Sequence, residues 1–373
     1  MNYRRKLFKI SDIYNLPASD ELFLAAMRQN IDFHIENSEE FRRILGEANF
    51  SPASLRSMAD IADIPILPTM FLKKHSLFSV PENKLRMEFT SSGTSGAEPS
   101  RVGLDSATLE LSMRMVVRTL LKHSLITPRP ANYIVLGYEP SRDINAGAVK
   151  TAYGMTFAAP ALHREYALRH TKEGYELNLD GIRTALLRYE KQGHPIRFMG
   201  FPAYFYFLLQ MLEAEGISLR LNPKSKVFLH GGWKQFHTQK QDKGVLYEMA
   251  ERLLGIGEET FHDFYGPVEH PIFYADCPCH HFHVPIYSRV IIRDIRTLEP
   301  LPYGNVGLVN LISPHMCAMP YASIMPDDLG VMYPGEECPC GNKSPWFVIL
   351  GRVGLSDIRT CAANAGELLV GIN

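Results

Sequence analysis

The chain has 373 residues, of which 46% are apolar and 21% charged, and its formal net charge at pH 7 is −1. This length and apolar content suffice for a large core, which predicts one elaborate domain or two. The near-zero charge gives no basic field for nucleic acid, and no apolar run is long enough to predict a membrane span. The amino-terminal stretch is basic but lacks the apolar segment of a secretory signal, so we expect a cytoplasmic protein.

Residues 1–80 are predicted to be mostly helical, with Ser11, Ser38 and Ser51 as N-caps. Apolar residues at helical spacing predict another helix over 105–123. Short apolar runs then alternate with helical patterns: strands are predicted at 133–137, 197–200 and 226–230, and helices at 180–192, 203–214 and 244–254. This alternation is typical of an α/β fold whose core sheet is mostly parallel.

The pattern of residue types changes after residue 285. The segments 290–294 and 306–312 are rich in β-formers, with proline and glycine between them, which predicts an antiparallel β subdomain. We therefore expect two domains. The first, 1–285, combines the helical amino-terminal segment with the α/β core, and the second, 286–373, is β-rich.

A serine- and glycine-rich loop is the sharpest local signal, reading Thr-Ser-Ser-Gly-Thr-Ser-Gly over residues 90–96. Two glycines among hydroxyl residues allow the backbone to turn tightly, approach an anion and offer N–H and O–H donors. The loop follows the apolar residues 87–89 and lacks the lysine of a P-loop NTPase. It predicts a phosphate-binding loop, with a plain flexible linker as the alternative.

All six cysteines lie in the last hundred residues: Cys277, Cys279, Cys317, Cys338, Cys340 and Cys361. A long chain without an export signal does not suggest a disulfide framework. Four of the six form two Cys-Pro-Cys pairs, and His280, His281 and His283 follow the first pair. These side chains exceed the four ligands of a closed tetrahedral zinc site. Free thiols in a reducing compartment are the alternative.

The serine- and glycine-rich loop resembles the phosphate loop of adenylate-forming enzymes, and later motifs follow in that family's order. They are Gly231-Gly232, Tyr265-Gly266-Pro267-Val268-Glu269, Asp327-Asp328-Leu329-Gly330 and Gly351-Arg352. The resemblance implies a substrate, ATP, and a Mg²⁺ ion held with the help of Glu269. It assigns ATP binding to Ser91, Ser92, Gly93, Thr94, Ser95, Gly96, Gly231, Gly232, Tyr265, Gly266, Asp328 and Arg352. Of the two adjacent acids, Asp328 is expected to reach the ribose and Asp327 to be solvated.

Closer details resemble the LuxE-type acyl-protein synthetases and the related phenylacetate–CoA ligases, from about residue 60 to the end. They are Gly-Gly-Trp-Lys at 231–234, Asp-Asp-Leu-Gly at 327–330, Cys-Pro-Cys-Gly at 338–341 and the segment 351–361. The resemblance implies that a carboxylic acid, fatty or aromatic, becomes acyl-AMP and is transferred to the thiol of Cys361. A partner reductase or an acyl carrier would then take the acyl group.

The metal ligands and one catalytic lysine also follow from the resemblance. Related ligases bind zinc through a cysteine, a histidine and a Cys-x-Cys pair, which implies the following set: Cys277, His283, Cys338 and Cys340. Cys279 or His281 could substitute. Most relatives carry a small lid domain with a catalytic lysine after the Gly-Arg motif. The chain ends soon after Arg352, so we expect no lid domain, and Lys234 is the hypothetical source of that positive charge.

Two alternative functions stay open. In the first, the acyl group goes to coenzyme A or to a carrier-protein thiol, and Cys361 takes no part. In the second, the chain is a non-catalytic scaffold that keeps the fold for protein interaction. The aromatic stretch 198–207 is predicted to form core, a wall of the acyl pocket, or both.

Overall fold

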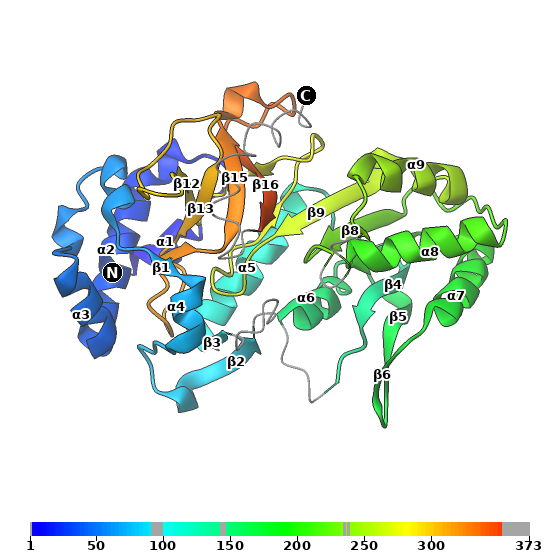
Figure 1. Ribbon diagram of the computed structural model, residues 1–373, viewed down its shortest axis with the longest axis horizontal. Helices are drawn as coiled ribbons and strands as arrows, with labels where there is room; N and C mark the ends of the chain where they lie inside the picture. The colour runs from blue at the N-terminus through cyan, green and yellow to red at the C-terminus, as the bar shows by residue number, and fades with distance from the viewer. Residues whose placement is uncertain (1, 91–99, 142–146, 234–235, 237–238, 353–373) are drawn as a thin grey trace. The chain divides into compact units, whose positions relative to one another are not determined.

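The computed structural model describes residues 2–90, 100–141, 147–233, 236 and 239–352 (Figure 1). The chain forms two compact units. Unit 1 comprises Met1–Thr119 together with Gly266–Asn373, and unit 2 comprises Leu120–Tyr265. Unit 1 is therefore discontinuous in sequence, whereas unit 2 is a single stretch of chain.

This division corrects the expected boundary near residue 285, which joined the amino-terminal helices to the α/β core. In the structure these helices belong with the β-rich segment. The short strand β1 (Leu67–Pro68) pairs in parallel with β14 (Ser323–Met325). Arg4 Nη1 donates to the carbonyl oxygen of His315 at 2.7 Å, and Asn30 Nδ2 donates to that of Met316 at 2.6 Å. Contacts between such distant parts of the chain leave no mark on local composition.

The helices of unit 1 are α1 (Tyr3–Leu7), α2 (Asp20–Asn37), α3 (Glu39–Glu47), α4 (Thr69–Lys74) and α5 (Ser106–Lys122). The last residues of α5, after Thr119, belong to unit 2. Ser38 caps α3 as predicted, because its Oγ accepts the N–H of Phe41 at 3.4 Å. Ser51 Oγ accepts the N–H of Ala53 and caps a 3-10 turn. Ser11 lies in a bend and caps no helix, so that prediction is wrong.

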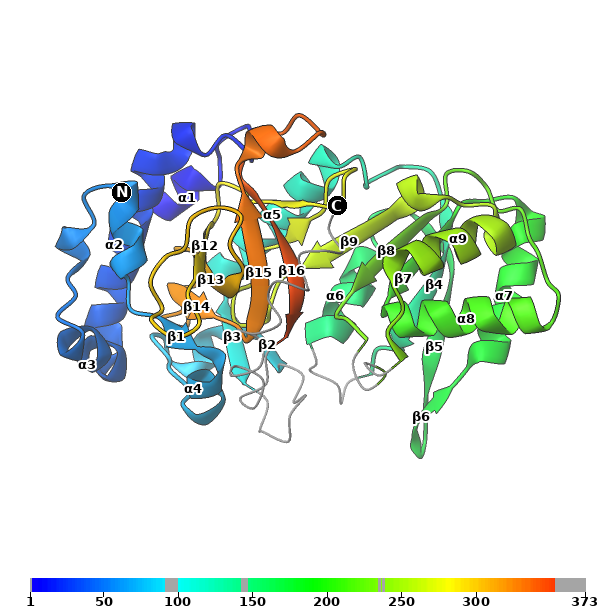
Figure 2. The ribbon, with the colours of Figure 1, turned by 45° about the horizontal axis from the view of Figure 1, so that its top comes forward.

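The main sheet of unit 1 has the order β1-β14-β13-β15-β16-β11, with β12 beside β13. Apart from the β1–β14 pair it is antiparallel, as the sequence predicted for this region. Figure 2 shows β12, β13, β15 and β16 side by side. The other strands of this sheet are β11 (Phe282–His283), β12 (Arg289–Arg293), β13 (Gly307–Ile312), β15 (Asp328–Tyr333) and β16 (Trp346–Arg352). Outside this sheet, β2 (Leu85–Thr90) pairs with β3 (Arg101–Asp105), and β10 spans Tyr274–Ala275.

Unit 2 contains a sheet with the order β9-β8-β7-β4-β5-β6, parallel except for β6, which pairs antiparallel with β5. Its strands are β4 (Ala131–Tyr138), β5 (Ala161–Thr171), β6 (Gly174–Leu177), β7 (Ile196–Gly200), β8 (Lys226–His230) and β9 (Phe261–Tyr265). Its helices are α6 (Gly147–Met155), α7 (Leu179–Gln192), α8 (Pro202–Ala214) and α9 (Lys243–Leu254). The predicted parallel α/β core is therefore confirmed.

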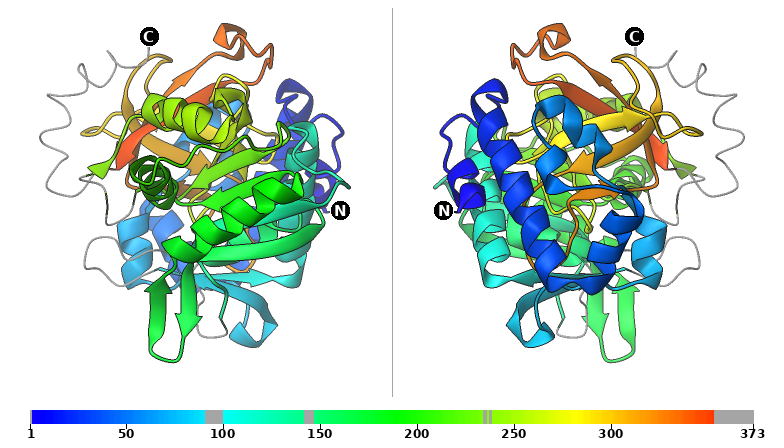
Figure 3. Two further views of the ribbon diagram at one scale, coloured as in Figure 1. Left: turned by 90° about the vertical axis from the view of Figure 1, so that its right-hand side faces the viewer. Right: turned by 90° about the vertical axis from the view of Figure 1, so that its left-hand side faces the viewer.

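The core of unit 2 lies between the sheet and the helices α7, α8 and α9, which are labelled in Figure 1 and seen from another side in the left panel of Figure 3. Every residue of β7 is buried, as expected for a central parallel strand covered on both faces. Phe198, Phe205, Leu208 and Leu186 are fully buried in this core.

Within the described ranges, no helix is both long enough and apolar enough to cross a bilayer.

Candidate active site

The serine- and glycine-rich loop joins the two strands of a hairpin. β2 and β3 are antiparallel, and their last pair is Thr90 with Arg101. The Arg101 guanidinium binds Glu88 through two contacts, Nε–Oε2 at 3.0 Å and Nη2–Oε1 at 2.8 Å, and these bonds raise the pKa of Arg101. The predicted phosphate-binding residues lie outside the described residues: Ser91, Ser92, Gly93, Thr94, Ser95 and Gly96. The structure thus shows a paired hairpin on either side of this segment of the sequence.

Glu269, the predicted Mg²⁺-binding carboxylate, is only 4% exposed. The hydroxyl of Ser100 donates a hydrogen bond to its Oε1. Ser100 is itself 1% exposed and directly follows the loop 91–99. The hydroxyl of Tyr321 is also buried, and the charge of Glu269 contributes, after burial, to its raised pKa. A buried carboxylate oxygen is the kind of ligand that Mg²⁺ accepts, so Glu269 fits its predicted role.

Gly266 shapes the turn that carries Glu269. A Cβ atom at this position would lie 2.6 Å from the carbonyl oxygen of Ile272, a separation that real side chains do not show. Inside the turn, the N–H of His270 donates to the carbonyl oxygen of Pro267 at 3.0 Å. The glycine of the Tyr-Gly-x-x-Glu motif is therefore required by close backbone packing.

Asp328 and Arg352 lie opposite each other at the paired ends of β15 and β16. Arg352 Nε lies 3.4 Å from Asp328 Oδ1, and their side chains are 48% and 12% exposed, respectively. Asp327 lies apart from this pair, and its Oδ2 accepts a hydrogen bond from Thr69 Oγ1 at 3.3 Å. The sequence analysis expected Asp327 to be solvated. In the structure it instead accepts a hydrogen bond from within the protein. The two predicted ribose-site residues are brought together.

The carboxyl ends of the parallel strands of unit 2 carry the predicted adenine-site residues. Gly231 and Gly232 follow β8 and have φ angles of 75° and 66°, which favour glycine. Tyr265 ends β9, and the register pairs His230 with Phe264. Gly231 and Tyr265 therefore emerge at neighbouring strand ends, on the edge where open α/β sheets bind ligands.

The aromatic stretch 198–207 divides between core and surface. Phe198 and Phe205 are fully buried. Tyr206 and Phe207 are partly buried, and their ring centroids lie 5.7 Å from Trp233 and 4.9 Å from Phe236, respectively. We call Tyr206, Phe207, Trp233 and Phe236 the aromatic wall. Trp233 directly follows the double glycine, so the wall lies beside that turn, and the next residue, Lys234, is outside the described part of the chain.

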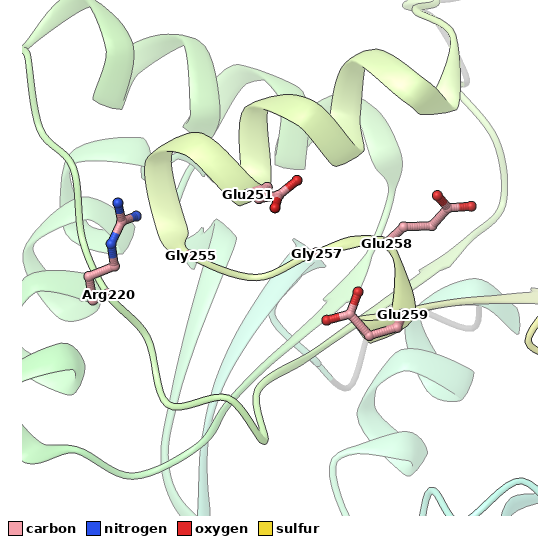
Figure 4. A pocket seen from close by; sticks show the side chains of 6 residues that line it. All are labelled: Arg220, Glu251, Gly255, Gly257, Glu258 and Glu259. Atoms are coloured by element: carbon pink, nitrogen blue, oxygen red, sulfur yellow. The ribbon is translucent and has the colours of Figure 1, made fainter.

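A surface pocket of about 520 Å³ in unit 2 lies elsewhere (Figure 4). Its charged lining is acidic apart from Arg220, with Glu251, Glu258 and Glu259. Glu258 and Glu259 precede β9, so the pocket lies at the amino end of that strand, whereas the double-glycine turn follows the carboxyl end of β8. A glutamate-rich pocket at the wrong edge is a poor receptor for ATP phosphates.

The predicted metal ligands form one cluster. The ligand atoms of the four predicted residues, Cys277, His283, Cys338 and Cys340, all lie within 4.8 Å of one another. The Sγ atoms of Cys277 and Cys338 are 3.7 Å apart, and His283 Nε2 is 3.2 Å from Cys340 Sγ. Tetrahedral zinc with thiolates at about 2.3 Å requires S–S separations of about 3.7 Å. The four side chains therefore fit a zinc ion.

Neighbouring groups orient these ligands. His283 Nδ1 bonds to the carbonyl oxygen of Ser344 at 2.7 Å, which leaves Nε2 facing the cluster. Backbone N–H groups of Cys279 and Asn342 donate to the sulfurs of Cys277 and Cys340, each at 3.4 Å. Burial raises the pKa of the Cys277 thiol and raises that of Cys338 to about 11. Buried thiols of this kind ionise when a cation binds them.

The two alternative ligands lie outside the cluster. Cys279 contributes its backbone N–H and not its sulfur. The ring of His281 stacks on Trp346 with centroids 3.6 Å apart, and its Nδ1 lies 3.2 Å from Cys338 Sγ. His281 thus contacts one of the predicted ligands, Cys338. The ligand atoms of the four residues predicted from the sequence, in contrast, all lie close to one another.

The profile of one protein family, described as acyl-protein synthetase, LuxE, matches residues 12–370. The chain belongs to this family. A long-chain-fatty-acid–luciferin-component ligase of Vibrio harveyi is 23% identical over 96% of this chain and 91% of the relative. A phenylacetate-coenzyme A ligase of Thermus thermophilus is 30% identical over 87% of this chain and 68% of the relative.

Solved structures agree on the fold. A 2-hydroxyisobutyryl-CoA ligase matches with a TM-score of 0.67 and 18% identity, over 92% of this chain and 76% of that chain. A long-chain-fatty-acid-CoA ligase from Archaeoglobus fulgidus matches with a TM-score of 0.51 and 11% identity, over 77% and 55% of the two chains. The expected adenylate-forming fold is confirmed.

As a member of the LuxE family, the protein is an enzyme: an AMP-forming acid–thiol ligase that makes an acyl-AMP and transfers the acyl group to a thiol. An AMP-forming ligase of this kind consumes ATP. The predicted acceptor Cys361 and the predicted Lys234 lie outside the described residues. Ser100 is the residue that the sequence did not single out, because its partner Glu269 lies 169 positions away.

Proposed function

We propose that the protein activates a long-chain fatty acid as acyl-AMP and transfers the acyl group to the thiol of Cys361. A partner reductase or another acceptor then removes it. The observation that carries this proposal is the pairing of Asp328 with Arg352 at the ends of β15 and β16, in a chain of the LuxE family. The name of the Vibrio harveyi relative supports the fatty acid as the substrate.

In the first step, a carboxylate oxygen of the fatty acid bonds to the α-phosphorus of ATP, and the bond to pyrophosphate breaks. Asp328 accepts hydrogen bonds from ribose hydroxyls, and Arg352 holds that carboxylate in place. Glu269 would hold Mg²⁺, which neutralises phosphate charge. Catalysis here is positioning and electrostatic stabilisation by groups already fixed in the fold.

In the second step, the Cys361 thiolate attacks the acyl carbon, AMP leaves, and a thioester forms on the protein. Arg352 and Arg359 are close to Cys361 in the sequence, and their positive charge would favour the thiolate. Lys234 is proposed to supply positive charge to the phosphates during adenylation. The aromatic wall offers an apolar surface beside the double-glycine turn, which suits the acyl chain.

Zinc is proposed to fill the cluster of Cys277, His283, Cys338 and Cys340. Four protein ligands leave no open position, so the ion would be structural and not catalytic. It would tie the turn after β10 to the turn before β16. Thiolate ligands require reduced cysteines, which supports the cytoplasm as the location.

ATP–pyrophosphate exchange with a panel of carboxylic acids tests the first step. We expect long-chain fatty acids to give the fastest exchange. Aromatic acids giving faster exchange would replace the fatty substrate with the class named for the Thermus thermophilus relative. No exchange with any acid would support the scaffold alternative.

Labelled fatty acid and ATP then test the acceptor. We expect an acid-stable, base-labile label on the protein that Cys361→Ser loses while pyrophosphate exchange continues. Label that appears on added coenzyme A, and is unchanged in Cys361→Ser, would instead identify a coenzyme A ligase. Retained label on the variant protein would contradict Cys361 as the acceptor.

A further inference from the structure

A buried hydrogen bond connects Ser100, the residue after the serine- and glycine-rich loop, to Glu269, the carboxylate proposed to bind Mg²⁺. Ser100 directly follows residues 91–99 and precedes Arg101, whose pairing with Thr90 closes the hairpin. Its hydroxyl donates to Glu269 Oε1. Ser100 and Glu269 are 1% and 4% exposed, so water does not compete strongly for this bond.

The bond has a clear physical effect on Glu269. A glutamate side chain has three rotatable bonds, and a free carboxylate would sample several orientations. A donated hydrogen bond to one oxygen restricts the carboxylate to orientations that keep this contact. Hydrogen bonds to charged groups are stronger than those between neutral groups, so the orientation that keeps this bond is favoured.

The loop exit is also fixed from the other side. Arg101 binds Glu88 with two contacts and Glu82 at 2.7 Å, so the backbone next to Ser100 is held by the hairpin. Gly266 fixes the turn that carries Glu269 by its close approach to Ile272. The hydrogen bond therefore joins the end of the β2–β3 hairpin to the turn that carries Glu269.

We propose that Ser100 is a positioning residue that orients the Glu269 carboxylate for Mg²⁺ and thereby couples metal binding to ATP binding. This inference rests on the proposed function. Ser100 touches neither the reacting atoms nor, in this role, the metal. It acts through Glu269, so its loss should weaken the response to Mg²⁺ more than the binding of metal-free ATP.

Tyr321 provides a matched control. Its hydroxyl is buried and has no hydrogen-bond partner among the residues that the structure describes. The charge of Glu269 contributes to the raised pKa of Tyr321, so the hydroxyl belongs to the same region. Tyr321→Phe removes a buried oxygen there and leaves the Ser100–Glu269 bond intact.

The test compares wild type with Ser100→Ala, Ser100→Thr and Tyr321→Phe. Equilibrium dialysis measures ATP affinity in EDTA and across a Mg²⁺ titration, independently of turnover. In Ser100→Ala we expect the Mg²⁺ concentration for half-maximal ATP binding to rise about tenfold or more, with affinity in EDTA unchanged. Ser100→Thr keeps a hydroxyl and should restore the wild-type Mg²⁺ response, and Tyr321→Phe should retain it.

A wild-type Mg²⁺ response in a folded Ser100→Ala protein would overturn the inference. If that variant does not fold, Ser100→Cys serves instead, because it keeps the size of the side chain and weakens the donor; an unchanged Mg²⁺ response would again overturn it. Mg²⁺-dependent ATP binding by a wild-type protein that exchanges pyrophosphate with no acid would refute the proposed function while leaving the role of Ser100 measurable by dialysis.

Discussion

At the scale of single residues, the backbone determines the geometry of Asp328 and Arg352, the pair proposed to bind the ribose. Asp328 begins β15 and Arg352 ends β16, and the antiparallel register places them opposite each other. Such a pair loses little conformational freedom on binding a ligand, because the strands already hold both residues in place. Asp327, one position earlier, is engaged elsewhere by Thr69.

Asp328→Asn should weaken ATP binding by about tenfold, since it removes the charge from the acceptor of the ribose hydroxyls. The matched control is Asp327→Asn, which affects the contact with Thr69 and should change ATP affinity much less. The KM for ATP in pyrophosphate exchange reports both. A larger effect in Asp327→Asn than in Asp328→Asn would reverse the assignment of the two acids.

The sequence could identify residues whose chemistry is distinctive but not those defined by a distant partner. The two Cys-Pro-Cys pairs and the neighbouring histidines indicated metal ligands, because together they offer more than the four ligands of a tetrahedral zinc site. Ser100 is a common residue type, and only the fold brings it to Glu269. The choice of His283 over His281 came from the resemblance, and the stacking of His281 on Trp346 could not be read from the sequence.

At the scale of elements, the cluster of Cys277, His283, Cys338 and Cys340 joins segments with little regular structure of their own. β11 has two residues, and a 3-10 turn formed by Gly335–Glu337 precedes Cys338. Short elements of this kind have few backbone hydrogen bonds to stabilise them. An ion bound by both segments would supply the missing stability, because metal-binding free energy becomes folding free energy.

Cys340→Ser should therefore abolish zinc binding and lower the free energy of unfolding by several kcal/mol. The matched control is Cys279→Ser, since the Cys279 sulfur lies outside the cluster. Elemental analysis of the purified proteins and urea unfolding provide the two readouts. Full zinc content in Cys340→Ser, or its loss in Cys279→Ser, would contradict the assigned ligand set.

Most elements of the α/β core could be predicted because pattern and burial agree there. The strand predicted at 226–230 is β8, and the helix predicted at 203–214 is α8 with one residue more. The hairpin of β5 and β6 was not predicted. β5 contains His163, Arg164 and Glu165 in place of an apolar run, and its pairing with β4 and β6 stabilises it. Tertiary pairing overrides local pattern in such strands.

At the scale of the whole molecule, stability should depend on a buried histidine in unit 1. His34 lies on α2 and is fully buried, with Nδ1 2.7 Å from Ser79 Oγ and Nε2 3.2 Å from the carbonyl oxygen of Met316. Burial lowers its pKa to about 3, with a further contribution from Arg4. The folded protein therefore keeps this histidine neutral under conditions in which the unfolded chain protonates it.

The sign of the pH effect follows from proton binding. Between pH 6.5 and about 3, the unfolded state carries the additional proton, so stability falls as the pH falls. Between pH 7 and pH 5 the loss attributable to His34 is roughly 2 kcal/mol. His34→Gln should lose much of this pH dependence, whereas His194→Gln on the surface should retain it. Urea unfolding at both pH values provides the measurement, and an equal pH dependence in all three proteins would contradict the prediction.

The fold class was readable from the sequence, whereas the composition of the two units was not. Alternating strands and helices indicate an α/β core wherever they occur. The pairing of Leu67 with Ile324 is carried by a strand of two residues, too short to leave a periodic pattern. For this reason the amino-terminal helices were assigned to the wrong partner, although their helical character was predicted.

The discontinuity of unit 1 has a consequence for synthesis of the protein. Unit 2 leaves the ribosome as one uninterrupted stretch, before β14 has been translated. Leu67 cannot pair until Ile324 has been added, 257 positions later, which takes on the order of tens of seconds at ordinary elongation rates. During that interval β14, the partner of β1 in the described part of the chain, has not yet been made. The nascent chain can thus complete its central unit before its amino-terminal portion can complete its own sheet.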